Sequence, residues 1–246
     1  LASSMAVLTQ DERDIGVALV DIGGGTTDIA VFIDGAIRHT AVIPIAGDQV
    51  TNDIAMALRT PTVEAEELKL RYGVTKQMMV PPDSMIEIPG VGDRVARRVK
   101  RQSLAAVIEP RVEELFVLVQ RNLEEAGFSH LISSGVVLTG GTSLLPGMTE
   151  LAEEVFMKPV RIAQPAYDGN LADIVCNPRY ATVVGLLIEV RKQKGETSLG
   201  NARGNSRHPN IPSTKMSSHH QGHTHVNDGS QKSILIKMKE WFMKTF

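Results

Sequence analysis

Residues 17–32 read VALVDIGGGTTDIAVF, the most informative stretch of the chain. Two apolar, β-branched runs flank a Gly-Gly-Gly-Thr-Thr turn, so the sequence predicts two strands joined by a glycine-rich loop. Glycines let a ligand approach the backbone closely, and successive N–H groups in such a turn form a concave site for phosphate oxygens. A hairpin without a ligand needs only two turn residues, so the additional glycines and threonines favour a phosphate-binding loop.

The loop also carries side chains that suit a nucleotide and its metal ion. The predicted phosphate contacts come from Gly23, Gly24, Gly25, Thr26 and Thr27. Asp21, at the end of the first strand, is predicted to hold a magnesium ion through water. The loop is not a P-loop, because it lacks Gly-Lys-Ser/Thr and is followed by a strand rather than a helix.

Outward from this loop, apolar strands alternate with helical patterns, which predicts an α/β fold. The predicted strands are 15–22, 27–33, 36–44, 134–139 and 160–163, with a hairpin near 84–100. The predicted helices are 47–59, 63–72, 103–126, 147–157 and 179–194. Pro110 predicts a kink or a boundary within the long helical stretch.

The composition of the 246 residues narrows the class of protein. An apolar content of 42% is ordinary for a globular protein, and a net charge of −2 predicts no nucleic-acid partner. One cysteine excludes an internal disulfide framework. No apolar run approaches the roughly 20 residues that span a bilayer. The start at Leu1, without methionine or a signal peptide, indicates a fragment whose front is missing.

A second glycine loop follows a strand at 136–147, which reads VVLTGGTSLLPG. Taken alone it is an ordinary strand-to-helix connection, but nucleotides usually bind where such loops meet at strand ends. Between the two loops, Glu66 and Lys69 lie one helical turn apart and are expected either to reach a ribose or base or to form an exposed ion pair.

The chain changes character after residue 194. Residues 195–232 are rich in Gly, Ser, Asn, His and Pro, which predicts a disordered linker. Residues 233–246 form an amphipathic helical pattern with lysines opposite an apolar arc, which favours an interfacial membrane helix; a helix docked in a partner's groove is the alternative. The apolar arc consists of Ile234, Leu235, Met238, Trp241, Phe242 and Phe246.

Four motifs in order, DIGGGTTD, IPIAGDQVTNDIA, LTGGTSLLPG and NPRYATVVGLL, resemble the second half of the actin/Hsp70/sugar-kinase superfamily. VIEPRVEEL and the basic, aromatic C-terminal segment narrow the resemblance to the bacterial cell-division family FtsA. The resemblance implies half of an actin-like (ribonuclease H-like) fold without its first lobe. It implies subdomain 2A at 1–60 and 128–194, with subdomain 2B inserted at 61–127.

The resemblance also implies ATP and magnesium as ligands. It matches residues 21–27 to the family's second phosphate loop, and Gly47 and Asp48 to the segment that follows it. Glu66 and Lys69 match the helix that lines the adenosine. Gly140, Gly141 and Thr142 match the adenosine loop.

The function implied is a scaffold rather than an enzyme, with weak ATPase activity at most. It would attach to anionic lipid on the cytoplasmic face of the inner membrane at the division site and self-associate into filaments. It would also bind other division proteins and the C-terminal tail of FtsZ. Within 61–127, the basic residues Arg97, Arg98 and Arg101 are the candidates for that tail.

Two other classes compete with this interpretation. An actin-fold ATPase or small-molecule kinase with a partner-docking C-terminal helix is the main alternative, although the chain shows no acceptor-substrate site. An Hsp70-like chaperone is disfavoured, because no β-sandwich peptide-binding domain follows.

Overall fold

The computed structural model describes residues 1–90, 95–167 and 171–203, and for 194–203 it describes the backbone alone. Residues Leu1–Arg203 form one compact unit. Its strands are β1 (Val17–Ile22), β2 (Thr27–Ile33), β3 (Ala36–Ile43), β4 (Met85–Ile88), β5 (Arg97–Lys100), β6 (Val136–Thr139) and β7 (Val160–Ile162). Its α-helices are α1 (Ala2–Val7), α2 (Gln10–Ile15), α3 (Gly47–Leu58), α4 (Thr62–Tyr72), α5 (Arg101–Glu125), α6 (Met148–Phe156), α7 (Ala172–Val175) and α8 (Ala181–Arg203). Three 3-10 helices are η1 (Gln77–Met79), η2 (Gly141–Leu144) and η3 (Pro178–Tyr180).

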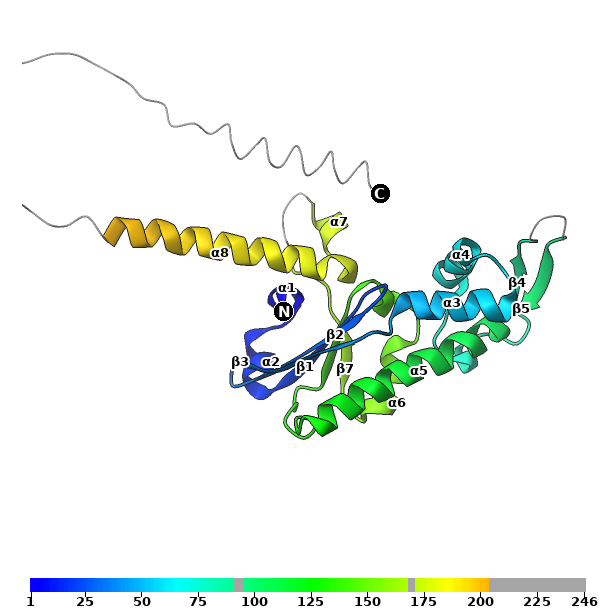
Figure 1. Ribbon diagram of the computed structural model, residues 1–246, viewed down its shortest axis with the longest axis horizontal. Coiled ribbons are helices and arrows are strands. Elements are labelled where there is room, and N and C mark those ends of the chain that lie inside the picture. Colours follow the sequence, from blue (N-terminus) through cyan, green and yellow to red (C-terminus); the bar gives the residue numbers. More distant parts are fainter. Residues whose placement is uncertain (91–94, 168–170, 204–246) are drawn as a thin grey trace, which may run out of the picture. The chain divides into compact units, whose positions relative to one another are not determined.

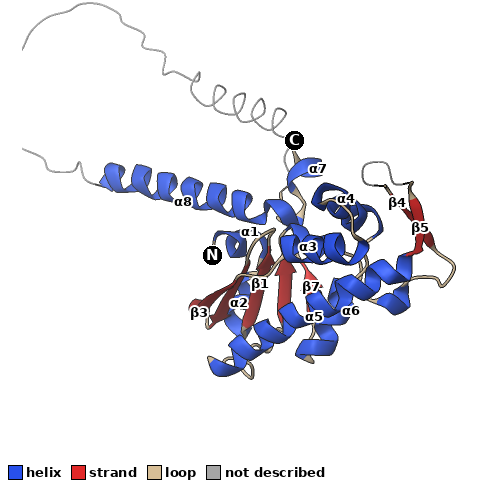
Figure 2. Ribbon diagram, turned by 45° about the vertical axis from the view of Figure 1, so that its right-hand side comes forward, coloured by secondary structure: helices blue, strands red, loops and turns tan. Residues whose placement is uncertain are grey.

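A five-stranded sheet with the order β3-β2-β1-β6-β7 forms the centre of this unit (Figure 2). The strands β1, β2 and β3 pair antiparallel, whereas β6 pairs parallel with both β1 and β7. The predicted strands on both sides of the glycine loop, and those near 134–139 and 160–163, are therefore confirmed. The mixed sheet agrees with the predicted α/β class.

Alternating side chains of β1 serve two separate cores, which is why this strand reads as a continuous apolar run. Val17 and Leu19 face a smaller core with residues of α1 and α8. Ala18, Val20 and Ile22 face the larger core, against α3, α5 and α6. Figure 1 shows α1 and α8 on one side of the sheet and α5 and α6 on the other.

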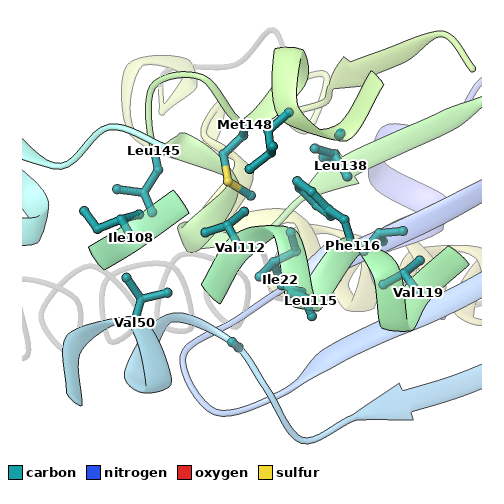
Figure 3. Close-up of a cluster of buried hydrophobic side chains, with 14 of the residues drawn as sticks. Ile22, Val50, Ile108, Val112, Leu115, Phe116, Val119, Leu138, Leu145 and Met148 are labelled. Atoms are coloured by element: carbon teal, nitrogen blue, oxygen red, sulfur yellow. The ribbon is translucent and has the colours of Figure 1, made fainter. Parts of the chain in front are cut away.

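The larger core is built around α5, whose apolar residues recur at helical spacing as predicted. Figure 3 shows Val112 and Phe116 of this helix beside Met148 of α6 and Leu138 of β6. Phe116 is fully buried and contacts the ring of Phe156 edge-on, with 5.4 Å between the centroids. Burial of several such side chains, each contributing about 1.5–3 kcal/mol, holds the helix against the sheet.

The predicted boundary at Pro110 is wrong, because α5 continues through it from Arg101 to Glu125. Proline removes one intrahelical hydrogen bond and costs roughly 3 kcal/mol inside a helix. Here Pro110 and Ala106, whose carbonyl loses its usual donor, are both exposed residues of α5. The buried side of the helix offsets this cost.

Two short helices precede the first strand, where no helix was predicted from the sequence. The helix α2 begins with a capping box in which Thr9 and Glu12 bond one another's backbone N–H groups. The helix α1 crosses α8 so closely that a Cβ atom on Gly185 would lie 1.8 Å from the carbonyl oxygen of Ala2. Glycine at 185 therefore permits this crossing.

The last helix is longer than predicted. It continues to Arg203, so residues 195–203 are helical where a linker was expected from residue 195. This stretch contains Glu, Leu, Ala and Arg among its glycines, and these are good helix formers. Over the described ranges, no helix is both long and apolar enough to cross a membrane.

A separate two-stranded sheet, β4 with β5, lies apart from the main sheet and confirms the hairpin predicted near 84–100 (Figure 1). Ile86 and Ile88 of β4 are buried in the larger core. The opposite strand, β5, is mostly exposed, and three of its four residues are basic. The hairpin is thus anchored by one strand and presents the other to solvent.

Candidate functional site

The glycine loop between β1 and β2 is held in place by its own backbone. The N–H of Gly23 donates to the carbonyl of Thr26, which closes the turn at 3.0 Å. The carbonyls of Gly23 and Gly24 accept the N–H groups of Gly47 and Asp48 at the start of α3. The loop is thereby tied to a helix N-terminus, an arrangement that favours anions.

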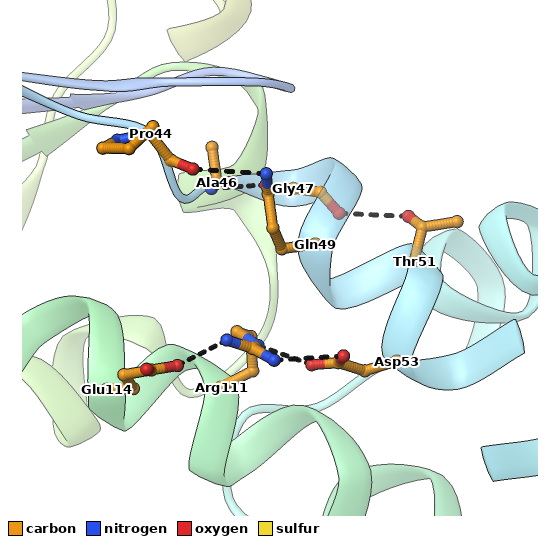
Figure 4. Close-up of polar contacts among 8 residues, drawn as sticks. All are labelled: Pro44, Ala46, Gly47, Gln49, Thr51, Asp53, Arg111 and Glu114. Carbon is orange, nitrogen blue, oxygen red and sulfur yellow. Dashed lines mark hydrogen bonds and ion pairs between the residues drawn. The ribbon is translucent and has the colours of Figure 1, made fainter. Parts of the chain in front are cut away.

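The start of α3 is shaped by side chains of the segment around it (Figure 4). The carboxamide of Gln49 accepts the N–H of Ala46 at 2.9 Å and donates to the carbonyl of Pro44 at 3.3 Å. A Cβ atom on Gly47 would lie 2.4 Å from the hydroxyl oxygen of Thr142. Only glycine therefore fits between the first loop and the second.

The second loop contacts the first directly. The hydroxyl of Thr142 donates to the carbonyl of Gly23 at 2.7 Å, so residues 119 positions apart meet. Gly140 has φ +87°, and a Cβ atom there would lie 2.4 Å from the carbonyl oxygen of Ile22 at the end of β1. The predicted convergence of the two glycine loops is thus present in the geometry.

Lys69 lies in a cluster with Glu66 and a residue that the sequence analysis did not single out, Thr51. The ammonium of Lys69 donates to the carbonyl of Gly47 at 3.0 Å and to the hydroxyl of Thr51 at 2.8 Å. It also pairs with Glu66 at 2.7 Å, while the hydroxyl of Thr51 donates to the same carboxylate. The Lys69 side chain is only 7% exposed, so its charge is already paired inside the protein.

These elements enclose a cavity of about 570 Å³, within the range usual for small-molecule sites. Of the residues predicted from the sequence, the cavity is lined by Gly23, Gly24, Gly47, Asp48, Glu66, Lys69, Gly141 and Thr142. The residues that the sequence analysis missed are Leu70, Leu144, Leu145, Pro146 and Arg179. Leu70 and Leu144 carried a sequence signal only by position, because Leu70 directly follows Lys69 and Leu144 lies within the second glycine-loop motif.

The remaining residues predicted for the two loops lie beside the cavity rather than along its wall. The buried hydroxyl of Thr27 donates to the carbonyl of Ile45 at 2.7 Å. Gly25 and Thr26 are exposed at the tip of the turn. Gly140 is buried next to the end of β1. These positions shape the loops instead of lining the cavity.

Asp21 lies at the end of β1, as predicted, and one of its carboxylate oxygens accepts the hydroxyl of Thr182 at 3.0 Å. The other oxygen faces Gly140, where an added Cβ atom would come within 2.6 Å of it. Within the described ranges, no three His, Cys, Asp or Glu side chains gather as a metal cluster. A single carboxylate suits magnesium only when water and phosphate supply the other ligands.

The three arginines predicted to bind a partner differ in their contacts. Arg97 donates to the carbonyl of Leu58 at the end of α3. Arg101 donates to the carbonyl of Tyr72 at the end of α4, at 2.8 Å. Arg98 lies opposite Glu87 in the β4–β5 ladder, and its exposed side chain has no hydrogen bond or ion pair with any residue that the structure describes. Arg97 therefore fastens β5 to the end of α3, Arg101 joins the start of α5 to the end of α4, and the side chain of Arg98 has no partner among the described residues.

Residues 18–185 match the family model described as cell division protein FtsA. The chain is 50% identical over 247 residues to the cell division protein FtsA of Pseudomonas aeruginosa, and the match covers all of this chain. The chain belongs to the FtsA family. The FtsA protein of Escherichia coli is 48% identical over 194 residues, or 76% of this chain. The chain spans 55% and 46% of the lengths of these two relatives.

The fold of this FtsA family member is also found in solved structures. The structure of MreB5 of Spiroplasma citri bound to ADP matches 80% of this chain and 60% of its own, with a TM-score of 0.64 at 19% identity. The pilus complex PilM–PilN gives a TM-score of 0.53 at 20% identity. At these identities the likeness concerns the fold alone, and the fold is actin-like.

One predicted site of the FtsA family member lies outside the described residues. The apolar arc of the C-terminal segment, Ile234 to Phe246, falls in the range after residue 203. The linker expected from 204 to 232 falls there too.

Proposed function

We propose that this chain binds ATP with magnesium and forms part of a membrane-attached scaffold for cell division, which anchors FtsZ filaments to the inner membrane. The observation that carries the nucleotide part is the cavity in which two glycine loops are joined by the Thr142–Gly23 hydrogen bond. Membership of the FtsA family supports the cell-division part. We propose a scaffold and not a metabolic enzyme.

The cavity offers a polar end and an apolar end, which suits a nucleotide. The rest of the first glycine loop and the positive end of the α3 dipole suit phosphate oxygens, although the N–H groups of Gly23, Gly47 and Asp48 already donate to carbonyls of the protein. The exposed leucines Leu70 and Leu144 line the cavity as well and suit a purine ring. Asp21 would support the magnesium ion through water. The related fold of MreB5 has been solved with ADP and with AMPPNP, which agrees with this assignment.

The test of nucleotide binding is Gly24→Val. A Cβ atom on Gly24 would meet only the carboxylate of Asp48, at 3.1 Å, and this side chain can move aside. The variant should therefore fold normally while its extra methyl groups occupy the space for phosphate. We expect the Kd for magnesium–ATP, measured by calorimetry, to rise about tenfold or more. Ala57→Val, at an exposed position of α3, is the control; equal affinity in both variants would remove the loop from the site.

For FtsZ, we propose that the acidic groups of its C-terminal tail meet the basic face of β5 in the proposed subdomain 2B. Arg98 supports this role best, because it is exposed and without a described partner. We expect Arg98→Glu to weaken binding of a tail peptide, and added salt to weaken the wild-type complex. The double variant Arg98→Glu with Arg101→Glu should weaken it further. Binding indifferent to charge and to salt would contradict the electrostatic contact.

For the membrane, we propose that residues 233–246 insert their apolar arc among anionic lipids, and that rows of self-associated subunits strengthen the attachment. Sedimentation with anionic liposomes tests the proposal through Trp241→Glu, which places a charge on the apolar arc. The variant should remain in the supernatant. If it pellets as well as the wild type, the segment serves a partner's groove instead.

A further inference from the structure

Arg179 lines the cavity from η3, a segment that the sequence analysis assigned to a helix and not to the site. Its backbone is fixed from two sides. The carbonyl of the preceding residue, Pro178, accepts the N–H of Gly140 at 3.2 Å. The N–H of Arg179 itself donates to the side chain of Asn177 at 3.1 Å. An added Cβ atom on Gly141 would lie 3.7 Å from the Cβ of Arg179, so the side chain starts beside the second glycine loop.

The charges that line the cavity are two carboxylates, Asp48 and Glu66, and two cations, Lys69 and Arg179. The two negative and the two positive formal charges therefore sum to zero. Lys69 is buried, and its ammonium is already engaged with Glu66, Thr51 and the carbonyl of Gly47. Arg179 is exposed, and its guanidinium has no hydrogen bond or ion pair with any of the residues described. Within the described part of the chain, it is the cavity cation whose donors are free for a ligand.

A nucleotide remains negatively charged even when magnesium neutralises part of its phosphate chain. The wall without Arg179 would carry a net negative charge from Asp48 and would repel such a ligand. A guanidinium offers five N–H donors in a planar fork that matches two phosphate oxygens at once. The side chain at 179 therefore has the charge and the geometry that the rest of the wall lacks.

The contacts of the segment around Arg179 place it close to the end of β1, the strand that leads into the first glycine loop. Thr182, one turn after Arg179, donates to Asp21 at the end of the strand that leads into the phosphate loop. The apolar part of the wall, which suits the base, is formed by Leu70, Leu144 and Leu145. The second glycine loop, beside which Arg179 starts, is bonded to Gly23 of the first loop through Thr142, so Arg179 starts where the two loops meet.

We propose that Arg179 is a nucleotide-binding residue whose guanidinium pairs with the phosphate chain. The inference rests on the proposed nucleotide function and adds to it the residue that supplies the missing positive charge. It also predicts a difference between two ligands. Arg179 contributes to the affinity for a phosphorylated nucleoside, and it contributes nothing to the affinity for a nucleoside without phosphate.

The test compares Arg179→Ala with Arg179→Lys and with Arg121→Ala. Arg121 is an exposed arginine of α5 away from the cavity, and its replacement changes the net charge equally. Calorimetry measures the Kd of the wild type and of each variant for magnesium–ATP and for adenosine. The proteins are the 246-residue chain and the same chain fused behind the N-terminal portion of the Pseudomonas aeruginosa relative, which is the longer protein. Thermal unfolding confirms that each variant is folded.

We expect Arg179→Ala to raise the Kd for magnesium–ATP about tenfold or more, the loss typical of a charge-assisted hydrogen bond, and to leave adenosine binding within about twofold. Arg179→Lys should recover part of the affinity, and Arg121→Ala should match the wild type. The affinity of the wild type should also fall more steeply with salt than that of Arg179→Ala.

The possible failures are distinguishable. If the wild type binds neither ligand in either form, the proposed nucleotide function fails, and this inference with it. If the wild type binds magnesium–ATP and Arg179→Ala binds it equally, the nucleotide function stands and the role of Arg179 is overturned. If Arg179→Ala loses ATP and adenosine to the same extent, the side chain contacts the base, and the phosphate assignment is overturned.

Discussion

The cavity and the β4–β5 hairpin are built in opposite ways. Around the cavity, Lys69, Thr51 and Thr142 are already bonded to backbone carbonyls or to one another. On the hairpin, Arg97 of the exposed strand reaches the end of α3, and the side chain of Arg98 has no partner among the described residues. The cavity therefore has a shape set by the fold, whereas the hairpin offers side chains that can adapt to a partner.

The helix α3 joins the two regions, since it begins at the cavity with Gly47 and ends where Leu58 accepts Arg97 (Figure 1). Midway, Arg111 of α5 forms a two-point contact with Asp53 and also bonds Glu114 (Figure 4). Substitutions that disturb the tightly packed contacts around the cavity should lower the free energy of unfolding, whereas substitutions of exposed side chains on the hairpin should not. The following experiments test that contrast, from the largest expected effect to the smallest.

The largest effect is expected for Gly140→Ala. The residue has φ +87°, and its new Cβ atom would press on the carbonyl of Ile22 at 2.4 Å. Gly127→Ala is the matched control, because it has φ +79° but open space around the added atom. Chemical denaturation should show a loss of about 3 kcal/mol for Gly140→Ala, from strain and overpacking together, and about 1 kcal/mol for the control. Equal losses would mean that the second loop is not tightly fitted.

The next effect concerns the ion pair that braces α3. The hydrogen bonds that Arg111 donates to Asp53 are the main reason that the pKa of Arg111 is raised above its usual range. Asp53→Ala should cost about 2 kcal/mol, because it leaves a partly buried guanidinium short of its partner. The comparison is Glu67→Ala, which breaks an exposed pair with Arg71 and should cost under about 0.5 kcal/mol. Urea denaturation measures the free energy of unfolding of both variants, and equal losses would mean that the Arg111–Asp53 pair does not stabilise α3.

A pH-dependent effect is expected at Glu12, which joins α2 to β7 through Arg161 at 2.7 Å. Burial opposes ionisation of Glu12, but the hydrogen bonds from Arg161 and Thr9 outweigh it and lower its pKa below 4.5. A depressed pKa gives stability that is present above the unfolded-state value and is lost as the pH falls through the folded-state value. The stability gap between the wild type and Glu12→Gln should therefore narrow as the pH falls below 4.5. A gap that stays constant from pH 7 to acid would contradict this role.

The smallest effects separate two neighbouring arginines. Arg97→Ala removes a donor from the last turn of α3 and should lower stability by about 1 kcal/mol. Arg98→Ala removes an exposed side chain with no described partner and should change stability by less than about 0.5 kcal/mol. Differential scanning calorimetry of the two variants measures the contrast. Equal losses would show that Arg98 is also part of the scaffold.

The sequence predicted the parts of this fold whose causes are local. Apolar alternation predicted β1, β2 and β3, and helical spacing predicted α5, since burial follows directly from periodicity. The helices α1 and α2 escaped prediction because they are short and because α1 depends on its close crossing of α8 at Gly185. Of the two effects predicted for Pro110, a kink or a boundary, the boundary is absent, since tertiary burial of α5 outweighs a local helix breaker.

The sequence predicted the parts of the candidate site that are marked by glycines in the two loops and at the start of α3. Gly23, Gly47 and Gly141 carry that signal in the sequence, and all three line the cavity. The commitment of Lys69 to a buried cluster could not be predicted, because it depends on Thr51 from another helix. Arg179 lies within the NPRYATVVGLL motif, but nothing in the sequence marked its side chain as part of the site, since only the folded chain brings η3 beside the second glycine loop.

The hydrogen bond from Thr142 to Gly23 has a consequence for how the chain folds. Its two residues are 119 positions apart, so the contact closes a long loop of chain and is expected to form late. The hairpin of β1 and β2 can form from neighbouring residues alone, but the cavity needs β6 to be in place beside β1. During synthesis, the first glycine loop would therefore emerge well before its counterpart, and the cavity would form only after Thr142 has left the ribosome.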